Sequence, residues 1–167
     1  EREELEILFM RYWIVFMVVT AGAAERQAEE GAADGGDAVG DGLDAVTVTR
    51  WASAFGAWLP PGPVVVGRDS RPSGPMVLDA VAAALASTGH DILDIGIATT
   101  PTTEVAVQES DAVGGVIITA SHNPQQWNAL KFLSERGEFL GPEAGGAVRE
   151  RCDADRDLWA RWDGVGG

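Results

Sequence analysis

Three short apolar runs, each followed at once by a polar loop, constrain the fold of this chain more than any other feature. They read PVVVGRDSRPSG, DILDIGIATTP and AVGGVIITASHNP, and helical segments separate them. Runs of β-branched residues that break into turns are typical of buried strands. Strands that alternate with helices at these intervals pair in parallel. The sequence therefore predicts a three-layer α/β domain with a largely parallel sheet.

The helices can be placed by their apolar spacing and their end signals. DAVTVTRWASAFGAWLPPG puts Val46, Trp51 and Phe55 near helical spacing and stops at its prolines, so we expect an amphipathic helix whose aromatic side chains lie in the core. A second helix starts at the candidate cap Ser73 and ends at Gly89.

The remaining elements are shorter. TPTTEVAVQES predicts a short helix with Pro101 at or near its first position. NALKFLSERGEFLG predicts a hairpin that turns at residues 135–137, and PEAGGAVRERCDADRDLWARW predicts a closing helix.

Composition excludes several classes of protein. The chain of 167 residues has 46% hydrophobic and 23% charged residues, which fits one soluble domain with a packed core. Its net charge of −14 repels nucleic-acid phosphates, so we expect no nucleic-acid partner. The single Cys152 can form no intramolecular disulfide, which is consistent with a reducing compartment such as the cytoplasm.

Two segments before Leu43 differ from the rest. Residues 5–24 are apolar but are interrupted by Arg11 and follow an acidic start, which favours a helix or strand on the core over a membrane anchor or signal peptide. Residues 25–42 are rich in Gly, Ala and acids and predict a flexible, solvated loop.

The polar loops are expected to meet, because the carboxyl ends of parallel strands lie along one edge of a sheet. The last loop carries Ser121, His122 and Asn123, and Lys131 follows ten residues after the serine. The first loop carries Arg68 and Arg71. Three polar loops at one edge predict a functional site.

Two chemical schemes fit these residues. In a serine hydrolase, His122 would act as base to Ser121, but adjacent residues rarely place a ring nitrogen on the hydroxyl, and no G-x-S-x-G motif is present. In phosphoryl transfer, Ser121 would carry a phosphoryl group whose charge is offset by cations. The cations that these loops offer are Arg68, Arg71 and Lys131.

A purely structural interpretation also exists for each part. Ser, Asn and Pro are common turn formers, so the serine loop alone is compatible with an ordinary turn. Arg68 and Arg71 alone are compatible with surface residues or with an ion pair to Asp69. The joint placement of the three loops favours a site.

The same motifs, in this order, carry a family resemblance. GRDSRPSG, GIATTPTTEVAV and GGVIITASHNPQQWNALKF closely resemble the first domain of the alpha-D-phosphohexomutases, the phosphoglucomutase/phosphomannomutase family that includes phosphoglucosamine mutases. The resemblance runs from about Val39 to about Val148. It implies a three-layer α/β/α sandwich with a mostly parallel mixed sheet.

The resemblance also implies a reaction and roles for residues. Ser121 matches the serine that is phosphorylated, donates its phosphoryl group to a hexose phosphate and takes one back through a bisphosphate intermediate. A magnesium ion sits on the phosphoserine, and a hexose bisphosphate acts as activator. His122 and Lys131 match positions that line the reaction centre, and Arg68 matches an arginine of the adjacent loop.

The chain departs from the family pattern in two places. ADGGDAVGDGL stands where the family has an S-G-I-R-G-type loop, and it lacks the arginine. Asp153, Asp155 and Asp157 resemble the family's D-x-D-x-D-R metal loop but in the wrong register, so we interpret them as a solvated helix face.

We accordingly divide the chain into three parts. Residues 1–38 form a non-family segment, 39–150 the phosphohexomutase domain I, and 151–167 a tail or truncated linker. The expected partners are a hexose phosphate and the family's domains II–IV, without which the chain is expected to be inactive. The alternative is a non-catalytic domain of the same fold that binds phosphate or a partner.

Overall fold

The computed structural model describes residues 37–39, 42–154 and 158–167. The apolar segment 5–24 and most of the acidic segment 25–42 lie outside the described residues, as do Asp155 and Asp157. Within the segment predicted as a flexible loop, Asp37–Val39 instead forms strand β1, which pairs with β2 (Gly42–Leu43). Backbone pairing needs no large apolar side chains, so composition did not reveal it. No helix in the described parts has the length and apolar character needed to cross a membrane.

A mixed sheet of four strands, in the order β4-β3-β5-β7, forms the centre of the described structure. Its strands, in chain order, are β3 (Val64–Arg68), β4 (Ile92–Ile97), β5 (Gly114–Ile118) and β7 (Leu130–Ser134). Strand β3 runs parallel to β4 and β5, whereas β7 runs antiparallel to β5. The prediction of a mostly parallel sheet is confirmed.

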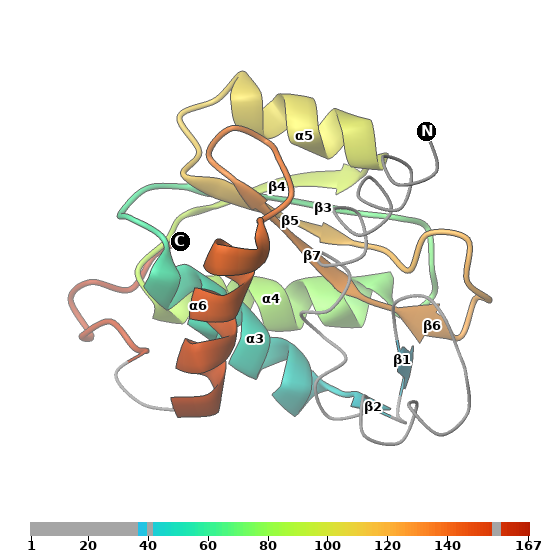
Figure 1. Cartoon of the computed structure of the whole chain (residues 1–167), viewed down its shortest axis with the longest axis horizontal. Coiled ribbons are helices and arrows are strands. Elements are labelled where there is room, and N and C mark those ends of the chain that lie inside the picture. The colour runs from blue at the N-terminus through green and yellow to red at the C-terminus, as the bar shows by residue number, and fades with distance from the viewer. Residues whose placement is uncertain (1–36, 40–41, 155–157) are drawn as a thin grey trace, which may run out of the picture.

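Helices cover both faces of this sheet (Figure 1). Helix α5 (Thr100–Gln108) lies on one face. The other face is covered by α3 (Ala45–Trp58), α4 (Gly74–Ser87) and α6 (Pro142–Ala154). The three-layer α/β/α arrangement is the predicted one. Because both faces are buried, the central strands are continuously apolar rather than alternating.

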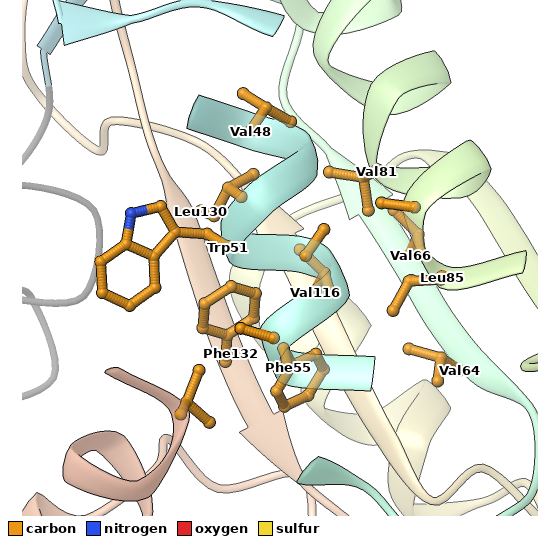
Figure 2. Close-up of a cluster of buried hydrophobic side chains, with 14 of the residues drawn as sticks. Val48, Trp51, Phe55, Val64, Val66, Val81, Leu85, Val116, Leu130 and Phe132 are labelled. Carbon is orange, nitrogen blue, oxygen red and sulfur yellow. The ribbon is translucent and has the colours of Figure 1, made fainter. Parts of the chain in front are cut away.

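The larger of two cores lies between the sheet and α3, α4 and α6 (Figure 2). At its centre the rings of Phe55 and Phe132 stack with centroids 4.4 Å apart. Val66 and Leu85 close the core on the α4 side, and each is fully buried. Removing a side chain of this size from water contributes roughly 1.5–3 kcal/mol, so this core fixes α3 and α4 against the sheet.

The phase of helix α3 was only partly predicted. Trp51 and Phe55 are buried as expected, but Val46, which the helical spacing places with them, is 73% exposed. Val48 takes the buried position in the first turn. The helix starts after the cap Asp44, whose carboxylate accepts a hydrogen bond from the amide of Thr47 at 2.7 Å. That starting point, which the apolar spacing does not specify, decides which valine faces inward.

A smaller core lies under α5. The strand residues that point to this face, Val65, Ile117 and Leu133, pack with Val107 of α5. Val65 alternates with Val64 and Val66, which point to the larger core, as the pleat requires. The sheet therefore presents one apolar face to each core, up to the edge at which β3 and β5 end.

The starts of α4 and α5 both lie at that edge. Thr99 caps α5 by accepting from the amide of Thr102 at 3.3 Å. Ser73 occupies the N-cap position of α4 as predicted, but its side chain makes no capping bond. Its hydroxyl instead accepts a hydrogen bond from the Nδ2 of Asn128 at 2.9 Å, which ties α4 to β6 (Trp127–Asn128).

The two histidines of the chain have opposite environments. His122 is exposed, whereas His90 is 3% exposed and follows Gly89, which takes a positive φ of 95° just after α4. The Nδ1 and Nε2 of His90 lie 2.8 Å from the carbonyl oxygens of Gly62 and Gly56. His90 thus joins the end of α3 to the turn that precedes β3.

Replacing His90 is therefore expected to destabilise the fold. In His90→Leu, buried carbonyl oxygens lose their donor, and we expect the free energy of unfolding to fall by about 1–3 kcal/mol. Urea denaturation monitored by tryptophan fluorescence measures it. The exposed His122→Ala serves as control and should change stability by less than about 0.5 kcal/mol. Equal effects of the two substitutions would contradict a structural role for His90.

Candidate functional site

Strands β3, β4 and β5 are parallel, so the loops that leave their carboxyl ends emerge at one edge of the sheet (Figure 1). These are the segments that carry Arg71, Thr99 and Ser121. Strand β7 begins at the same edge, because Leu130 pairs with Ile118 at the end of β5. The sequence-based prediction that these loops meet at one edge agrees with this topology.

The serine loop is compact and strained at one residue. Ser121 is exposed and has a φ of 56°, the only positive value among the described residues other than glycine. Its amide donates to the Oγ1 of Thr119 at 3.1 Å. Two turns follow, in which the amides of Asn123 and Trp127 each donate to the main-chain oxygen three residues before them. A residue other than glycine with positive φ is uncommon and costs free energy, so it persists where the surrounding structure holds it.

Arg71 supplies most of those bonds. The residue is 9% exposed, and the Nε of its guanidinium donates to the carboxylate of Asp69 at 2.8 Å. Its Nη atoms donate to four main-chain carbonyls of the serine loop at 2.6–3.0 Å, those of Ser121, Asn123, Pro124 and Trp127. A guanidinium has five N–H donors, and all five are therefore engaged within the protein.

Asp69 links Arg71 to the end of β5. One carboxylate oxygen accepts from the Nε of Arg71 and from the hydroxyl of Thr119, the latter at 2.7 Å. The other oxygen accepts from the amide of Arg71 at 3.0 Å. Because Thr119 in turn accepts from the amide of Ser121, a chain of hydrogen bonds runs from the arginine loop to the serine.

Lys131 stands on β7 next to Leu130 and pairs with Ile117. Ile117 belongs to the core under α5, so the Lys131 side chain lies on that face of the sheet, with its Nζ 5.9 Å from the centroid of the Phe139 ring. Burial lowers the pKa of Lys131, while the negative charges of Glu104 and Asp69 act in the opposite direction. A cation that is partly desolvated interacts more strongly with an anion than one in open solvent.

Arg68 lies on the opposite face. It pairs with Ile118 of the larger core, and its side chain lies against Gly74 at the start of α4. Its Nη1 donates to the carbonyl of Asp69 at 3.1 Å, whereas its buried Nε has no hydrogen-bond partner. Arg68 and Lys131 therefore flank the serine loop from the two faces of the sheet.

The remaining predicted residues lie in the loop itself. His122 is exposed next to Ser121, and Asn123 is half-buried with its carbonyl held by Arg71. The structure thus brings Ser121, His122, Asn123 and Arg71 together in one loop cluster. Sequence reasoning did not single out Thr119. The D-x-R spacing of Asp69 and Arg71 and the T-x-S spacing of Thr119 and Ser121 are both visible in the sequence.

The described residues do not form a metal site by themselves. They include no group of three or more His, Cys, Asp or Glu side chains that could hold a metal ion. Asp153, at the end of α6, is exposed, which agrees with a solvated helix face.

Comparison with known proteins gives one consistent family. The sequence model of the phosphoglucomutase/phosphomannomutase alpha/beta/alpha domain I matches residues 28–158. A phosphoglucomutase/phosphomannomutase from Thermococcus kodakarensis is 44% identical over 103 residues, which cover 62% of this chain and 23% of the relative. A probable phosphoglucosamine mutase from Methanopyrus kandleri is 36% identical over 128 residues, covering 77% of this chain and 28% of the relative.

Solved structures agree. A phosphoglucomutase/phosphomannomutase family protein from Burkholderia thailandensis superposes with a TM-score of 0.70 at 27% identity, covering 80% of this chain and 31% of that one. A putative phosphomannomutase from Thermus thermophilus gives a TM-score of 0.68 at 29% identity, with coverages of 79% and 30%. The chain spans about a quarter of the length of the curated relatives it matches.

The environment of Lys131 leads to a pH-dependent prediction. Since burial lowers its pKa, its amine should be neutral, and react with an acylating reagent, at lower pH than an ordinary lysine amine. Lys131 is the only lysine in the chain, so peptide mass spectrometry can follow its acetylation as a function of pH without interference from other lysines.

Glu104→Gln tests the direction in which the charge of Glu104 shifts the pKa of Lys131. Removing this negative charge should lower the pKa of Lys131 further and move the acetylation profile to still lower pH. The matched control Glu135→Gln, in the exposed turn after β7, should leave the profile unchanged. A profile like that of a free lysine, or a shift to higher pH in Glu104→Gln, would contradict the assignment.

Proposed function

The chain belongs to the phosphoglucomutase/phosphomannomutase family through its alpha/beta/alpha domain I, and from that membership we propose that it serves as the catalytic-serine domain of a phosphohexomutase. In this proposal Ser121 stores a phosphoryl group that is exchanged with hexose 1- and 6-phosphates. The reaction class is intramolecular phosphotransfer by way of a hexose bisphosphate. The cytoplasm is the proposed compartment.

The observation that carries the proposal is the conformation of Ser121. The residue is exposed, its backbone has a positive φ, and hydrogen bonds hold its amide and its carbonyl. A serine hydroxyl is a poor nucleophile unaided, so phosphoryl chemistry on it depends on position and on compensation of charge. The loop presents the residue to solvent while its backbone is bonded on both sides. This combination supports covalent storage of a group better than it supports an ordinary surface turn, which has no reason to hold a positive φ at a serine.

The proposed charge compensation comes from the two faces of the sheet. A phosphoryl group on Ser121 would carry about two negative charges, and Lys131 and Arg68, on the strands that pair with β5, are the cations proposed to offset them. Lys131 suits this role as a compact, partly desolvated charge. His122 is proposed to act in proton transfer or to orient the loop through its ring.

Magnesium would bind through the phosphoryl oxygens of Ser121 as this domain's contribution, since the described residues offer no carboxylate cluster of their own. When bound, the ion would neutralise charge on the phosphoryl group. The other ligands, the residues that read the sugar, and complete mutase turnover are proposed to require further domains. This accords with the chain's coverage of its relatives, which is about a quarter of their length.

The first test is phosphorylation of Ser121. Incubating the chain with a hexose bisphosphate and magnesium should transfer one phosphoryl group: the serine oxygen forms the new bond to phosphorus, the bond to the sugar oxygen breaks, and the hydroxyl proton ends on the sugar. Intact-mass and peptide mass spectrometry should locate the group on Ser121 and find none in Ser121→Ala.

Ser70→Ala is the matched control, because Ser70 is an exposed serine in the neighbouring loop. It should be phosphorylated on Ser121 like the parent chain. If Ser121 is unmodified under every condition, the chain has kept the fold without the chemistry. The alternative of a non-catalytic domain that binds phosphate or a partner then replaces the proposal.

A further inference from the structure

Arg71 was predicted from its loop to offset phosphoryl charge, but its geometry points to a different task. Its five N–H donors face four loop carbonyls and one carboxylate oxygen, at 2.6–3.0 Å. Donating to a phosphate would require breaking at least one of these bonds in a side chain that is 9% exposed. We propose that Arg71 is a positioning residue that holds Ser121 in its reactive conformation and does not bind the substrate phosphate.

The bonds act on both sides of the strained residue. The carbonyl of Ser121 accepts from Nη2 of Arg71 at 3.0 Å, and its amide donates to Thr119, which is itself held by Asp69. Asp69 also accepts from the Nε of Arg71. The two peptide groups that define φ and ψ of Ser121 are thus fixed, directly or through two intermediates, by a single guanidinium.

The spread of the four carbonyls explains why arginine is needed. They belong to residues 121, 123, 124 and 127, so the guanidinium closes a loop of seven residues, 121–127. A planar fork with fixed donor directions can reach several acceptors at once. A lysine ammonium has three donors and no fork, and it could hold only part of the loop.

The ion pair with Asp69 opposes movement of the Arg71 guanidinium away from the serine loop. Arg71 and Asp69 lie 2.8 Å apart, with side chains that are 9% and 27% exposed. Displacing Arg71 toward a ligand would leave the Asp69 carboxylate without its partner and the carbonyls without donors, which is costly in a buried site. Arg68 and Lys131 are the cations proposed to meet the phosphoryl group, because neither belongs to the Arg71–Asp69 pair.

The test has two readouts. The second rests on the proposed phosphoryl transfer, whereas the first does not depend on it. The first readout is hydrogen exchange of the peptide that contains residues 119–128 in the full chain. The second is the rate of Ser121 phosphorylation as a function of hexose bisphosphate concentration. The variants are Arg71→Met and Arg71→Lys, with Arg136→Met as matched control, since Arg136 is 73% exposed in a turn outside the site.

A positioning role predicts a specific pattern. In Arg71→Met the loop should exchange at least about tenfold faster, and the maximal phosphorylation rate should fall roughly 100-fold, while the half-saturating bisphosphate concentration stays within about twofold. Arg71→Lys should fall between Arg71→Met and the parent chain in both readouts. Arg136→Met should match the parent chain.

Two results would overturn the assignment. A raised half-saturating concentration with an unchanged maximal rate would make Arg71 a phosphate-binding residue. Unchanged exchange of the loop would show that the guanidinium does not hold it. If the parent chain is never phosphorylated, the proposed function fails, and the exchange readout still decides whether Arg71 holds the loop.

A second variant covers the case in which Arg71→Met does not fold. Thr119→Val keeps the shape of the side chain and the Arg71–Asp69 pair but removes the hydroxyl that links Asp69 to the Ser121 amide. It should speed loop exchange and slow phosphorylation, each by several-fold to about tenfold, with half-saturation unchanged. Thr103→Val, which removes another buried hydroxyl, one that bonds to the main-chain carbonyl of the α5 N-cap Thr99, is the control and should change neither. Parent-like behaviour of Thr119→Val would also count against the proposed chain of bonds.

Discussion

The register between β5 and its two neighbours determines the geometry of the site. Strand β5 pairs in parallel with β3 and antiparallel with β7, so Ile118 stands between Arg68 and Leu130 at the edge of the sheet. The side chains of Arg68 and Lys131 then project to opposite faces because neighbouring positions in a pleated strand alternate. A slip of one residue in either pairing would reverse that relation and place a charge in one of the two cores. The apolar packing on both faces is therefore also what fixes the charges around Ser121.

The serine loop adds a local constraint to this register. Strand β5 ends at Ile118, and the chain turns back over residues 119–129 to return as β7 at Leu130. It does so with a residue in the left-handed region, which few side chains adopt without cost. Hydrogen bonds from the neighbouring loop of Asp69 and Arg71 offset the free-energy cost of this conformation. The start of that loop is itself bonded to β5, because the Asp69 amide donates to the Ile118 carbonyl at 3.0 Å. The strain is thus supported by the sheet and does not depend on the loop alone.

Sequence reasoning recovered the parts of this arrangement that leave a side-chain pattern. Buried strands, the aromatic face of α3 and the meeting of three loops are all encoded in periodicity and turn residues, and they were predicted. Val46 was misplaced because Val46 and Val48 are equally apolar and only the cap at Asp44 sets the phase of the helix. The partners of Arg71 could not be predicted for a different reason. Four of them are main-chain carbonyls 50 to 56 residues away, and a carbonyl has no residue identity to read. The lowered pKa of Lys131 likewise depends on burial and on Glu104 of another helix.

The overall charge of the chain does not oppose an anionic ligand at this edge. Its formal charge is −14, yet charges in solvent interact weakly beyond a screening length of about 10 Å at 0.1 M salt. Besides Arg71, the described cations at this edge are Arg68 and Lys131, and the negative charge of Glu104 acts on Lys131. Asp69 is the carboxylate held within the loop cluster, and its charge is paired with Arg71. By pairing with Asp69 and closing the loop at once, Arg71 offsets that negative charge, and in our proposal it does so without itself contacting the ligand.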